Sequence, residues 1–345
     1  MAAVSGPVEK ERLERGLAYL VSKGYEVVEA ANLRSRRGFL AGSDEERASG
    51  YRALLRDPAV DAIIFARGGY GASRILRYLD AGEMRANPKI HLGGSDLTAL
   101  FAWIGRHAGL VTFYGPMVAV EMAGEAVDLD WELSLRGGKV APHRIARENV
   151  LAPGITEGIL VGGCLSLLAS LCGTPEAIRG DGAIFFWEDT GEDAYELDRL
   201  LTQLERSGTL ERLRGMVIGS VVPRRDSGSP DAVRDYLRER FSGAPFPVAM
   251  GLQAGHLENP RTLPLGVSAR LDLGRDSGLG TRRVQINPKL KFRNSRSSAR
   301  LSHEDPVAGA RRRRGPGSIH RFVPRGREDL RRGRDRHGDV HHPIG

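Results

Sequence analysis

Hydrophobic and polar positions along the first 125 residues change repeatedly between a period of two and a period near 3.6. Leu13, Leu17 and Leu20 recur at helical spacing and predict a helix over residues 8–22. Short apolar runs that end abruptly in glycine or polar residues predict buried strands between such helices. The other elements expected here are strands at 25–30, 61–66, 90–93 and 110–113, and helices at 43–56, at 72–80, after Ser95 and from Pro116.

A second block of the same kind follows a stretch in which the periodicity fades. Between about Glu125 and Glu157 proline, glycine and charged residues become frequent, which indicates a linker over residues 126–157. Strands alternating with helices predict an α/β fold with a doubly wound, mostly parallel sheet. The elements expected beyond the linker are strands at 159–161, 183–187, 216–222, 246–250, 265–273 and 282–286, and helices at 165–172, 194–207 and 231–241.

The length of 345 residues suits two domains, predicted at residues 1–125 and 158–288. The net charge of +8 belongs to the remainder of the chain, because residues 289–345 carry 16 Lys/Arg and 6 Asp/Glu. This basic tail has almost no apolar period and is expected to be disordered. Its arginine cluster, Arg311–Arg314, leaves nucleic-acid binding open as a function of another class, with steep salt dependence. The near-neutral body argues against that as the main role.

Composition indicates the cellular compartment, and the spacing of the cysteines argues against a metal site or a disulfide framework. No apolar run approaches the roughly 18 residues that a membrane-spanning helix needs, and the N-terminus lacks the basic and apolar regions of a secretion signal. A cytoplasmic protein is therefore expected. The two cysteines, Cys164 and Cys172, lie eight positions apart in one apolar segment, which suits core positions and neither a metal site nor a disulfide framework.

Ser95 is the first candidate for a catalytic residue. It follows Gly93 and Gly94 at the end of one predicted strand and precedes a predicted helix. A strand that enters a helix through a Gly-Gly-Ser corner is typical of a nucleophile elbow, in which the serine is exposed above the helix N-terminus. The alternative is an ordinary turn with Ser95 as the helix N-cap.

Two residues further along the chain complete a candidate triad. Glu188 ends a strand that is expected to be buried, where its charge needs a partner, either in a structural ion pair or in a catalytic site. His256 lies in a glycine-containing loop just after another strand, the only body histidine so placed, although a lone loop histidine is usually a surface residue. The order Ser95, Glu188, His256 suits acyl transfer, with serine as nucleophile, histidine as base and glutamate fixing the imidazole.

Several further motifs make the sequence resemble one family, the LD-carboxypeptidases, which includes muramoyltetrapeptide carboxypeptidases and microcin C self-immunity hydrolases. The similarity extends over roughly residues 4–287. The matching motifs, in chain order, are Arg67-Gly-Gly-Tyr-Gly71, Gly94-Ser-Asp-Leu-Thr98, Tyr114-Gly-Pro116, Gly162-Gly-Cys-Leu-Ser-Leu-Leu168, Gly173-Thr-Pro175, Trp187-Glu-Asp-Thr-Gly-Glu192, Leu201-Thr-Gln-Leu204, Gly255-His256 and Leu263-Pro-Leu-Gly266.

The resemblance implies a flavodoxin-like N-terminal domain and a smaller, swivelling β/α domain that supplies Glu188 and His256. It implies an oxyanion hole formed by the backbone N–H groups of Gly69 and Asp96. It further implies a cytoplasmic homodimer that needs no metal or other cofactor. The activity implied is hydrolysis of the L,D-peptide bond that releases terminal D-alanine from murein tetrapeptides, with the serine, histidine and glutamate acting as a triad.

The substrate remains open between two classes at this point. Tyr114 and Cys164 stand where many carboxypeptidases of the family have histidine and asparagine, and these replacements favour the branch that cleaves a peptidyl-nucleotide. A tryptophan close to Ser95, such as Trp131 or Trp187, would support that alternative by stacking on a base. Arg67 and Tyr114 are candidate substrate-binding residues, although an arginine beside two glycines can equally brace its loop.

Overall fold

A four-stranded sheet forms the centre of the N-terminal domain in the computed structural model, which describes residues 1–124, 130–137, 141–225, 229–274, 278–281 and 320–321. Its strand order is β11-β4-β3-β2, and β2, β3 and β4 run parallel. The bounds are β2 (Ala62–Ile64), β3 (Ile90–Gly93), β4 (Thr112–Tyr114) and β11 (Leu263–Leu265).

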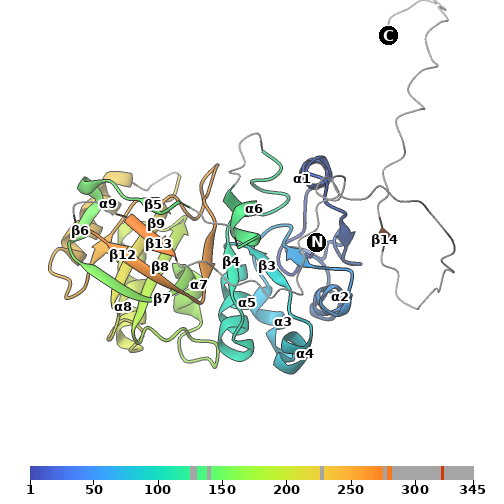
Figure 1. The fold of residues 1–345 in the computed structure, drawn as a ribbon, viewed down its shortest axis with the longest axis horizontal. Coiled ribbons are helices and arrows are strands. Elements are labelled where there is room, and N and C mark those ends of the chain that lie inside the picture. The colour runs from blue at the N-terminus through green and yellow to red at the C-terminus, as the bar shows by residue number, and fades with distance from the viewer. Residues whose placement is uncertain (125–129, 138–140, 226–228, 275–277, 282–319, 322–345) are drawn as a thin grey trace, which may run out of the picture.

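Helices cover both faces of this sheet (Figure 1). One face packs on α1 (Lys10–Ser22) and α6 (Asp130–Leu135), and the other on α2 (Asp44–Arg56), α3 (Ala72–Ile75), α4 (Ala81–Ala86) and α5 (Leu97–Trp103). Short helical turns extend α3 to Tyr78 and α5 to Ala108. Side chains alternate accordingly: Ile63 and Phe65 enter one apolar cluster, whereas Ile64 and Ala66 enter the other. The predicted doubly wound arrangement is confirmed for this domain.

The C-terminal domain is built on an eight-stranded mixed sheet of order β5-β13-β12-β7-β8-β9-β10-β6. The central strands β7 to β10 are parallel, and the flanking pairs are antiparallel. The bounds are β5 (His143–Arg144), β6 (Val150–Ala152), β7 (Ile155–Cys164), β8 (Ala183–Thr190), β9 (Gly215–Val222), β10 (Val248–Ala249), β12 (Val267–Asp272) and β13 (Gly278–Thr281). One face is covered by α7 (Leu165–Ser170), α8 (Ala194–Arg206) and α9 (Pro230–Phe241).

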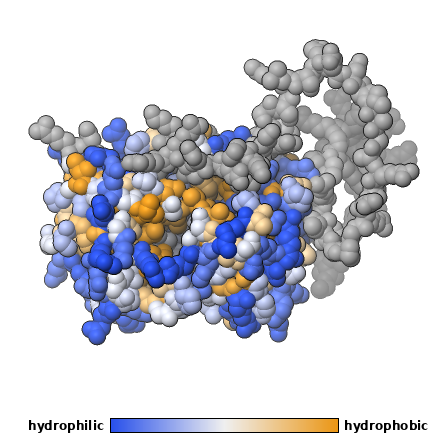
Figure 2. All heavy atoms as spheres, turned by 60° about the horizontal axis from the view of Figure 1, so that its bottom comes forward, coloured by the Kyte–Doolittle hydropathy of each residue, from blue (hydrophilic) through white to orange (hydrophobic). Residues whose placement is uncertain are grey.

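The other face of the large sheet shares its core with the N-terminal domain. Ile184, Phe186 and Val217 belong to the same apolar cluster as Tyr114, and the rings of Phe186 and Tyr114 meet edge to face with centroids 5.4 Å apart. The two domains are therefore joined by buried apolar surface as well as by the chain. Apolar side chains also gather at the centre of one outer face of the molecule, surrounded by hydrophilic ones (Figure 2).

The chain passes directly from one sheet to the other between β11 and β12. β11 pairs antiparallel with β4 of the N-terminal domain, and the chain then turns at Gly266, whose φ is 86°, directly into β12 of the C-terminal sheet. The sequence pattern predicted one strand over residues 265–273. The structure instead divides this region between two domains, because the glycine adopts a left-handed conformation that ends the first strand.

The helix predicted from Pro116 is wrong. Residues 115–124 form a series of turns, and their backbone groups bond to a neighbouring strand segment: the N–H of Val118 donates to Phe65 O and that of Ala119 to Ala66 O. Those donors are thus used across the sheet edge rather than along a helix. Within the predicted linker 126–157 lie α6, β5, β6 and the start of β7.

Two other features of the sequence analysis lie outside the described residues. They are the strand predicted at 282–286 and the Arg311–Arg314 cluster. Of the basic tail, only β14 (His320–Arg321) is described, and it pairs antiparallel with β1 (Val28–Glu29). Among the helices of the described segments, none combines the length and apolar character that crossing a membrane requires.

Gly16 provides a test of how tightly α1 packs on the 115–124 turns. Replacing a helical glycine by alanine normally stabilises a protein by about 1 kcal/mol. A Cβ at Gly16, however, would stand 1.9 Å from the carbonyl oxygen of Val118. Because overpacking costs about 1–3 kcal/mol, we expect Gly16→Ala to lower the melting temperature measured by circular dichroism. Gly105→Ala, where a Cβ meets nothing within 4 Å, is the control and should not; equal melting temperatures would contradict the packing argument.

Candidate active site

Ser95 occupies a strained corner between β3 and α5. Its φ is 58°, and it is the one residue other than glycine with a positive φ in the described part of the chain. A left-handed conformation at such a residue costs free energy and is typical of functional positions. The turn is held by two backbone bonds, from Leu97 N–H to Gly94 O and from Thr98 N–H to Ser95 O. The backbone therefore adopts the sharp strand-to-helix corner that a nucleophile elbow requires.

The glycine loop at residues 67–71 lies directly against this corner. A Cβ placed on Gly68 would come 2.8 Å from Cβ of Ser95 and 2.9 Å from its Oγ, so only glycine allows this approach. Gly69 adopts a φ of 109° and is exposed. In the described structure neither the N–H of Gly69 nor that of Asp96 donates a hydrogen bond. Both donors are thus free to bind an oxyanion that forms beside Ser95.

Tyr114 connects the nucleophile corner to the second domain. Its hydroxyl accepts a hydrogen bond from the Ser95 N–H at 2.8 Å and donates one to Oε1 of Glu188 at 2.6 Å. Burial and the neighbouring Glu188 carboxylate raise the pKa of Tyr114 well above its ordinary value, so the hydroxyl keeps its proton. The hydroxyl therefore acts both as a donor and as an acceptor in bonds to other groups of the protein.

Glu188 is fully buried at the end of β8 and meets His256 through its second oxygen. Oε2 lies 2.7 Å from Nδ1 of His256 and also accepts the His256 backbone N–H at 3.1 Å. A carboxylate only accepts, so Nδ1 carries the proton and Nε2 of a neutral ring is left as the basic nitrogen. Gly255 makes this approach possible, since a Cβ there would stand 2.6 Å from Oε2.

The charges around His256 favour its protonated form. Burial alone would lower the pKa of His256, but the hydrogen bond and charge of Glu188 outweigh it, and the charges of Asp189 and Glu121 add to them, so the pKa is raised above its ordinary value. Glu121 lies in the turns after β4, where its carboxylate accepts the Met117 N–H at 2.8 Å. The histidine is thus a stronger base than a free imidazole.

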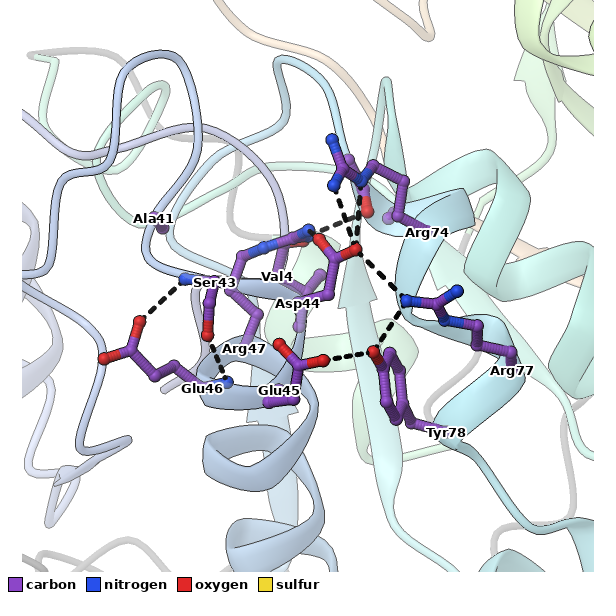
Figure 3. Close-up of polar contacts among 12 residues, drawn as sticks. Val4, Ala41, Ser43, Asp44, Glu45, Glu46, Arg47, Arg74, Arg77 and Tyr78 are labelled. Atoms are coloured by element: carbon purple, nitrogen blue, oxygen red, sulfur yellow. Dashed lines mark hydrogen bonds and ion pairs between the residues drawn. The ribbon is translucent and has the colours of Figure 1, made fainter.

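A polar network centred on Arg47 and Asp44 (Figure 3) is bonded to the C-terminal end of the glycine loop. The fully buried guanidinium of Arg47 donates to the carbonyls of Val4 and Gly71 and pairs with Asp44. The Asp96 carboxylate accepts the N–H of Ala72 at 2.8 Å, next to Gly71. Burial raises the pKa of Asp96, although hydrogen bonds from the loop backbone oppose the shift. The loop beside Ser95 is therefore fixed at its C-terminal end by two buried charged groups.

Arg67, at the other end of the loop, donates from Nη1 to Pro7 O at 3.2 Å. Its guanidinium also lies near Gly69, with Nη2 3.7 Å from a Cβ placed there. Among the described residues no acidic side chain pairs with it. It therefore both braces the loop, through Pro7, and keeps N–H groups available for an anion.

The structure thus brings Ser95, Tyr114, Glu188 and His256 into one chain of hydrogen bonds. No hydrogen bond joins the Ser95 hydroxyl to the His256 ring in the described residues; such bonds are often long before substrate binds. The described segments hold no group of three or more His, Cys, Asp or Glu side chains placed to bind a metal.

Sequence reasoning missed three contributors to this site. Arg47 lies inside a helix that opens with a capping box, and nothing in that pattern indicates that its guanidinium is buried beneath the loop. Glu121 falls in the segment expected to be helical. For Tyr114 the sequence suggests substrate binding only. Its position is the one feature that could have indicated a contact with the Ser95 corner, since Tyr114 ends a strand adjacent to the one that leads to Ser95.

Comparison with known proteins places both halves of the chain in one family. Residues 1–115 match the LD-carboxypeptidase N-terminal domain, and residues 157–271 match the LD-carboxypeptidase C-terminal domain. A putative carboxypeptidase of Streptomyces coelicolor is 39% identical over 282 residues, which cover 79% of this chain and 89% of that protein.

Solved structures agree with the fold. The muramoyltetrapeptide carboxypeptidase of Oxalobacter formigenes aligns with a TM-score of 0.70 and 30% identity, over 81% of this chain and 97% of that one. The microcin C7 self-immunity protein MccF of Escherichia coli, in complex with glutamyl sulfamoyl guanosine, aligns with a TM-score of 0.72 and 25% identity, over 81% and 94%. With both domain families matched in order, this chain is a peptidase that belongs to the LD-carboxypeptidase family.

Proposed function

We propose that this protein is a cytoplasmic serine carboxypeptidase that hydrolyses the L,D-peptide bond of murein tetrapeptides and releases their terminal D-alanine. The observation that carries the proposal is the hydrogen-bonded chain from the strained Ser95 corner through Tyr114 to Glu188 and His256. The murein substrate class follows the relative named muramoyltetrapeptide carboxypeptidase. As in the family expectation, the enzyme would act as a homodimer.

In the proposed reaction Ser95 Oγ attacks the carbonyl carbon of the scissile bond and gives its proton to Nε2 of His256. Glu188 holds the ring and stabilises the imidazolium that forms. The N–H groups of Gly69 and Asp96 bind the oxyanion. Collapse of the intermediate expels D-alanine, whose nitrogen takes the proton from His256, and water then releases the acyl chain by the same steps in reverse.

Arg67 suits the carboxylate of the departing D-alanine. It is the cation beside Gly69, and apart from the bond to Pro7 its N–H groups have no partner within the described residues. A carboxypeptidase needs a cation at that side of the scissile bond, because its substrate ends in a free carboxylate.

The peptidyl-nucleotide alternative gains no specific support from the two tryptophans considered for base stacking. Trp131 and Trp187 are both fully buried, the first beside α1 and the second in the core of the C-terminal domain. Neither presents a ring to a ligand. The alternative therefore rests on the likeness to MccF and on the residues Tyr114 and Cys164, and the muropeptide is the substrate that we propose first.

Removal of the nucleophile tests the reaction class. We expect Ser95→Ala to reduce D-alanine release from a purified murein tetrapeptide by about 10⁴-fold or more. Ser170→Ala, which changes an exposed serine on α7, is the matched control. Equal release by the wild type and Ser95→Ala would exclude Ser95 as the nucleophile. Absence of release by either would exclude the muropeptide and direct the next assay to a peptidyl-nucleotide.

The role of the Tyr114 hydroxyl can be separated from substrate binding. Because this hydroxyl bonds only protein groups, Tyr114→Phe should lower kcat about 10- to 100-fold and change KM little. Tyr25→Phe removes a hydroxyl that donates to Glu132 and serves as the control. A rise in KM at constant kcat would return Tyr114 to the substrate-binding role.

Glu121 should set the acid limit of activity. His256 must be neutral to accept the serine proton, so activity is lost as pH falls through its raised pKa. Glu121→Gln removes one of the negative charges that raise this pKa but keeps an oxygen for Met117. We expect the acid limb of the kcat/KM profile to move to lower pH. Glu205→Gln, an exposed change on α8, should leave it in place; an unmoved limb in Glu121→Gln would refute the coupling.

A further inference from the structure

A second hydrogen bond joins the nucleophile corner to the C-terminal domain and takes no part in the reaction proposed above. The backbone N–H of Cys164, at the end of β7, donates to Oγ1 of Thr98 on α5 at 2.9 Å. Thr98 has no exposed surface and Cys164 is 3% exposed, so water does not compete for this bond. Removal of the Thr98 hydroxyl would leave a buried N–H without its acceptor, which is unfavourable unless the domains shift.

Glycine allows β7 to approach α5 this closely. A Cβ placed on Gly163 would stand 2.5 Å from Oγ1 and 2.6 Å from Cγ2 of Thr98. The Cys164 side chain is itself bonded within the C-terminal domain, with Sγ 3.4 Å from Oδ1 of Asp189 and 3.3 Å from Oγ of Ser166. The strand end that meets Thr98 is therefore fixed in its own domain.

Thr98 lies three residues after Ser95 and is bonded to the same corner. Its N–H donates to Ser95 O at 2.9 Å, whereas the Ser95 N–H donates to the Tyr114 hydroxyl at 2.8 Å. Tyr114 in turn bonds Glu188. Thr98 in turn bonds Cys164. The backbone of the nucleophile is thus attached to the second domain at two points, one through its N–H and one through its carbonyl.

Both attachment points meet the same part of the C-terminal sheet. Cys164 on β7 is the register partner of Glu188 on β8. Glu188 bonds Nδ1 of His256 at 2.7 Å. Any displacement of β7 relative to α5 would therefore move Glu188, and with it the base, relative to Ser95. A single bond leaves a domain able to pivot about it, whereas two bonds also restrict that rotation.

We propose that Thr98 is a positioning residue whose hydroxyl, by accepting the Cys164 N–H, sets the separation between the Ser95 hydroxyl and the His256 ring. The proposal rests on the proposed function for the roles of Ser95 and His256. Thr98 has no exposed surface with which to contact a substrate, and it acts through Cys164. Without this bond the second domain shifts, and the proton transfer from serine to histidine slows because it requires hydrogen-bond reach.

The kinetics of D-alanine release test this role. Thr98→Val replaces the hydroxyl by a methyl group and removes the acceptor, so we expect kcat to fall about 10- to 100-fold with little change in KM. Thr98→Ser keeps the acceptor and should hold kcat within about threefold of the wild type. Equal kcat in the wild type and Thr98→Val, or an equal loss in both variants, would overturn the proposal.

Thr209→Val is the matched control. Thr209 is 7% exposed, and its hydroxyl bonds Ser207 Oγ at 2.9 Å within the C-terminal domain. The same substitution there removes a buried hydroxyl bond but leaves the contact between the domains intact. We expect it to lower the melting temperature and leave kcat unchanged. A matching loss of kcat in Thr209→Val would assign the effect of Thr98→Val to stability alone and refute the positioning role.

Amide hydrogen exchange, followed by mass spectrometry on the full-length protein, tests the positioning without any substrate. Thr98→Val should speed exchange in the peptides that contain Cys164 and His256, because the domains separate more often. Exchange in these two peptides should stay at the wild-type rate in Thr98→Ser and in Thr209→Val. Unchanged exchange in Thr98→Val would overturn the proposal.

The two measurements separate this inference from the proposed function. D-alanine release with the same kcat and the same exchange in the wild type and Thr98→Val would refute the positioning role and leave the proposed function standing. Faster exchange in Thr98→Val and not in Thr98→Ser, without D-alanine release from any tetrapeptide by the wild type, would support the positioning role and refute the murein substrate.

Discussion

The buried carboxylate of Glu188 is the interaction on which the rest of this structure depends. It has no exposed surface, and burying an unpaired charge would cost several kcal/mol. Three donors offset that cost: the Tyr114 hydroxyl from one domain, and the backbone N–H and ring Nδ1 of His256 from the other. Any swivel that separated the domains here would break the 2.6 Å bond from Tyr114 and leave the carboxylate with fewer partners. Electrostatics therefore favours the arrangement in which the site is assembled.

Hydrogen bonds from neighbouring residues hold the strained backbone of Ser95 in place. The left-handed serine conformation is unfavourable locally, and it persists because its N–H is bonded to Tyr114 and its neighbour Asp96 is anchored to the loop at Ala72. Arg47 holds the same end of the loop through the carbonyl of Gly71. The loop that carries the proposed oxyanion donor Gly69 is therefore held by the buried side chains of Arg47 and Asp96.

The connection between the domains places the histidine as well. β11 adds a strand to the N-terminal sheet, and the chain enters the C-terminal sheet one residue later. The loop that carries His256 lies just before this crossing, between β10 of one sheet and β11 of the other. Both ends of that loop are thus fixed by strand pairing, one in each domain. This limits how far the base can move from Glu188.

The sequence by itself determined the alternation of strands and helices, the two-domain α/β fold and the candidate residues Ser95, Glu188 and His256, because these follow from local periodicity, glycine corners and motif order. It could not show that the segment after Pro116 forms turns and not the expected helix. The backbone donors of that segment bond to residues 65 and 66, which are far away in sequence. Nor could it assign Tyr114 or Glu121, which act on Glu188 and His256 across the domain boundary, or Arg47, which bonds distant segments of its own domain. Only the tertiary structure decides such contacts, because hydrogen bonds between distant segments leave no periodic pattern in the chain.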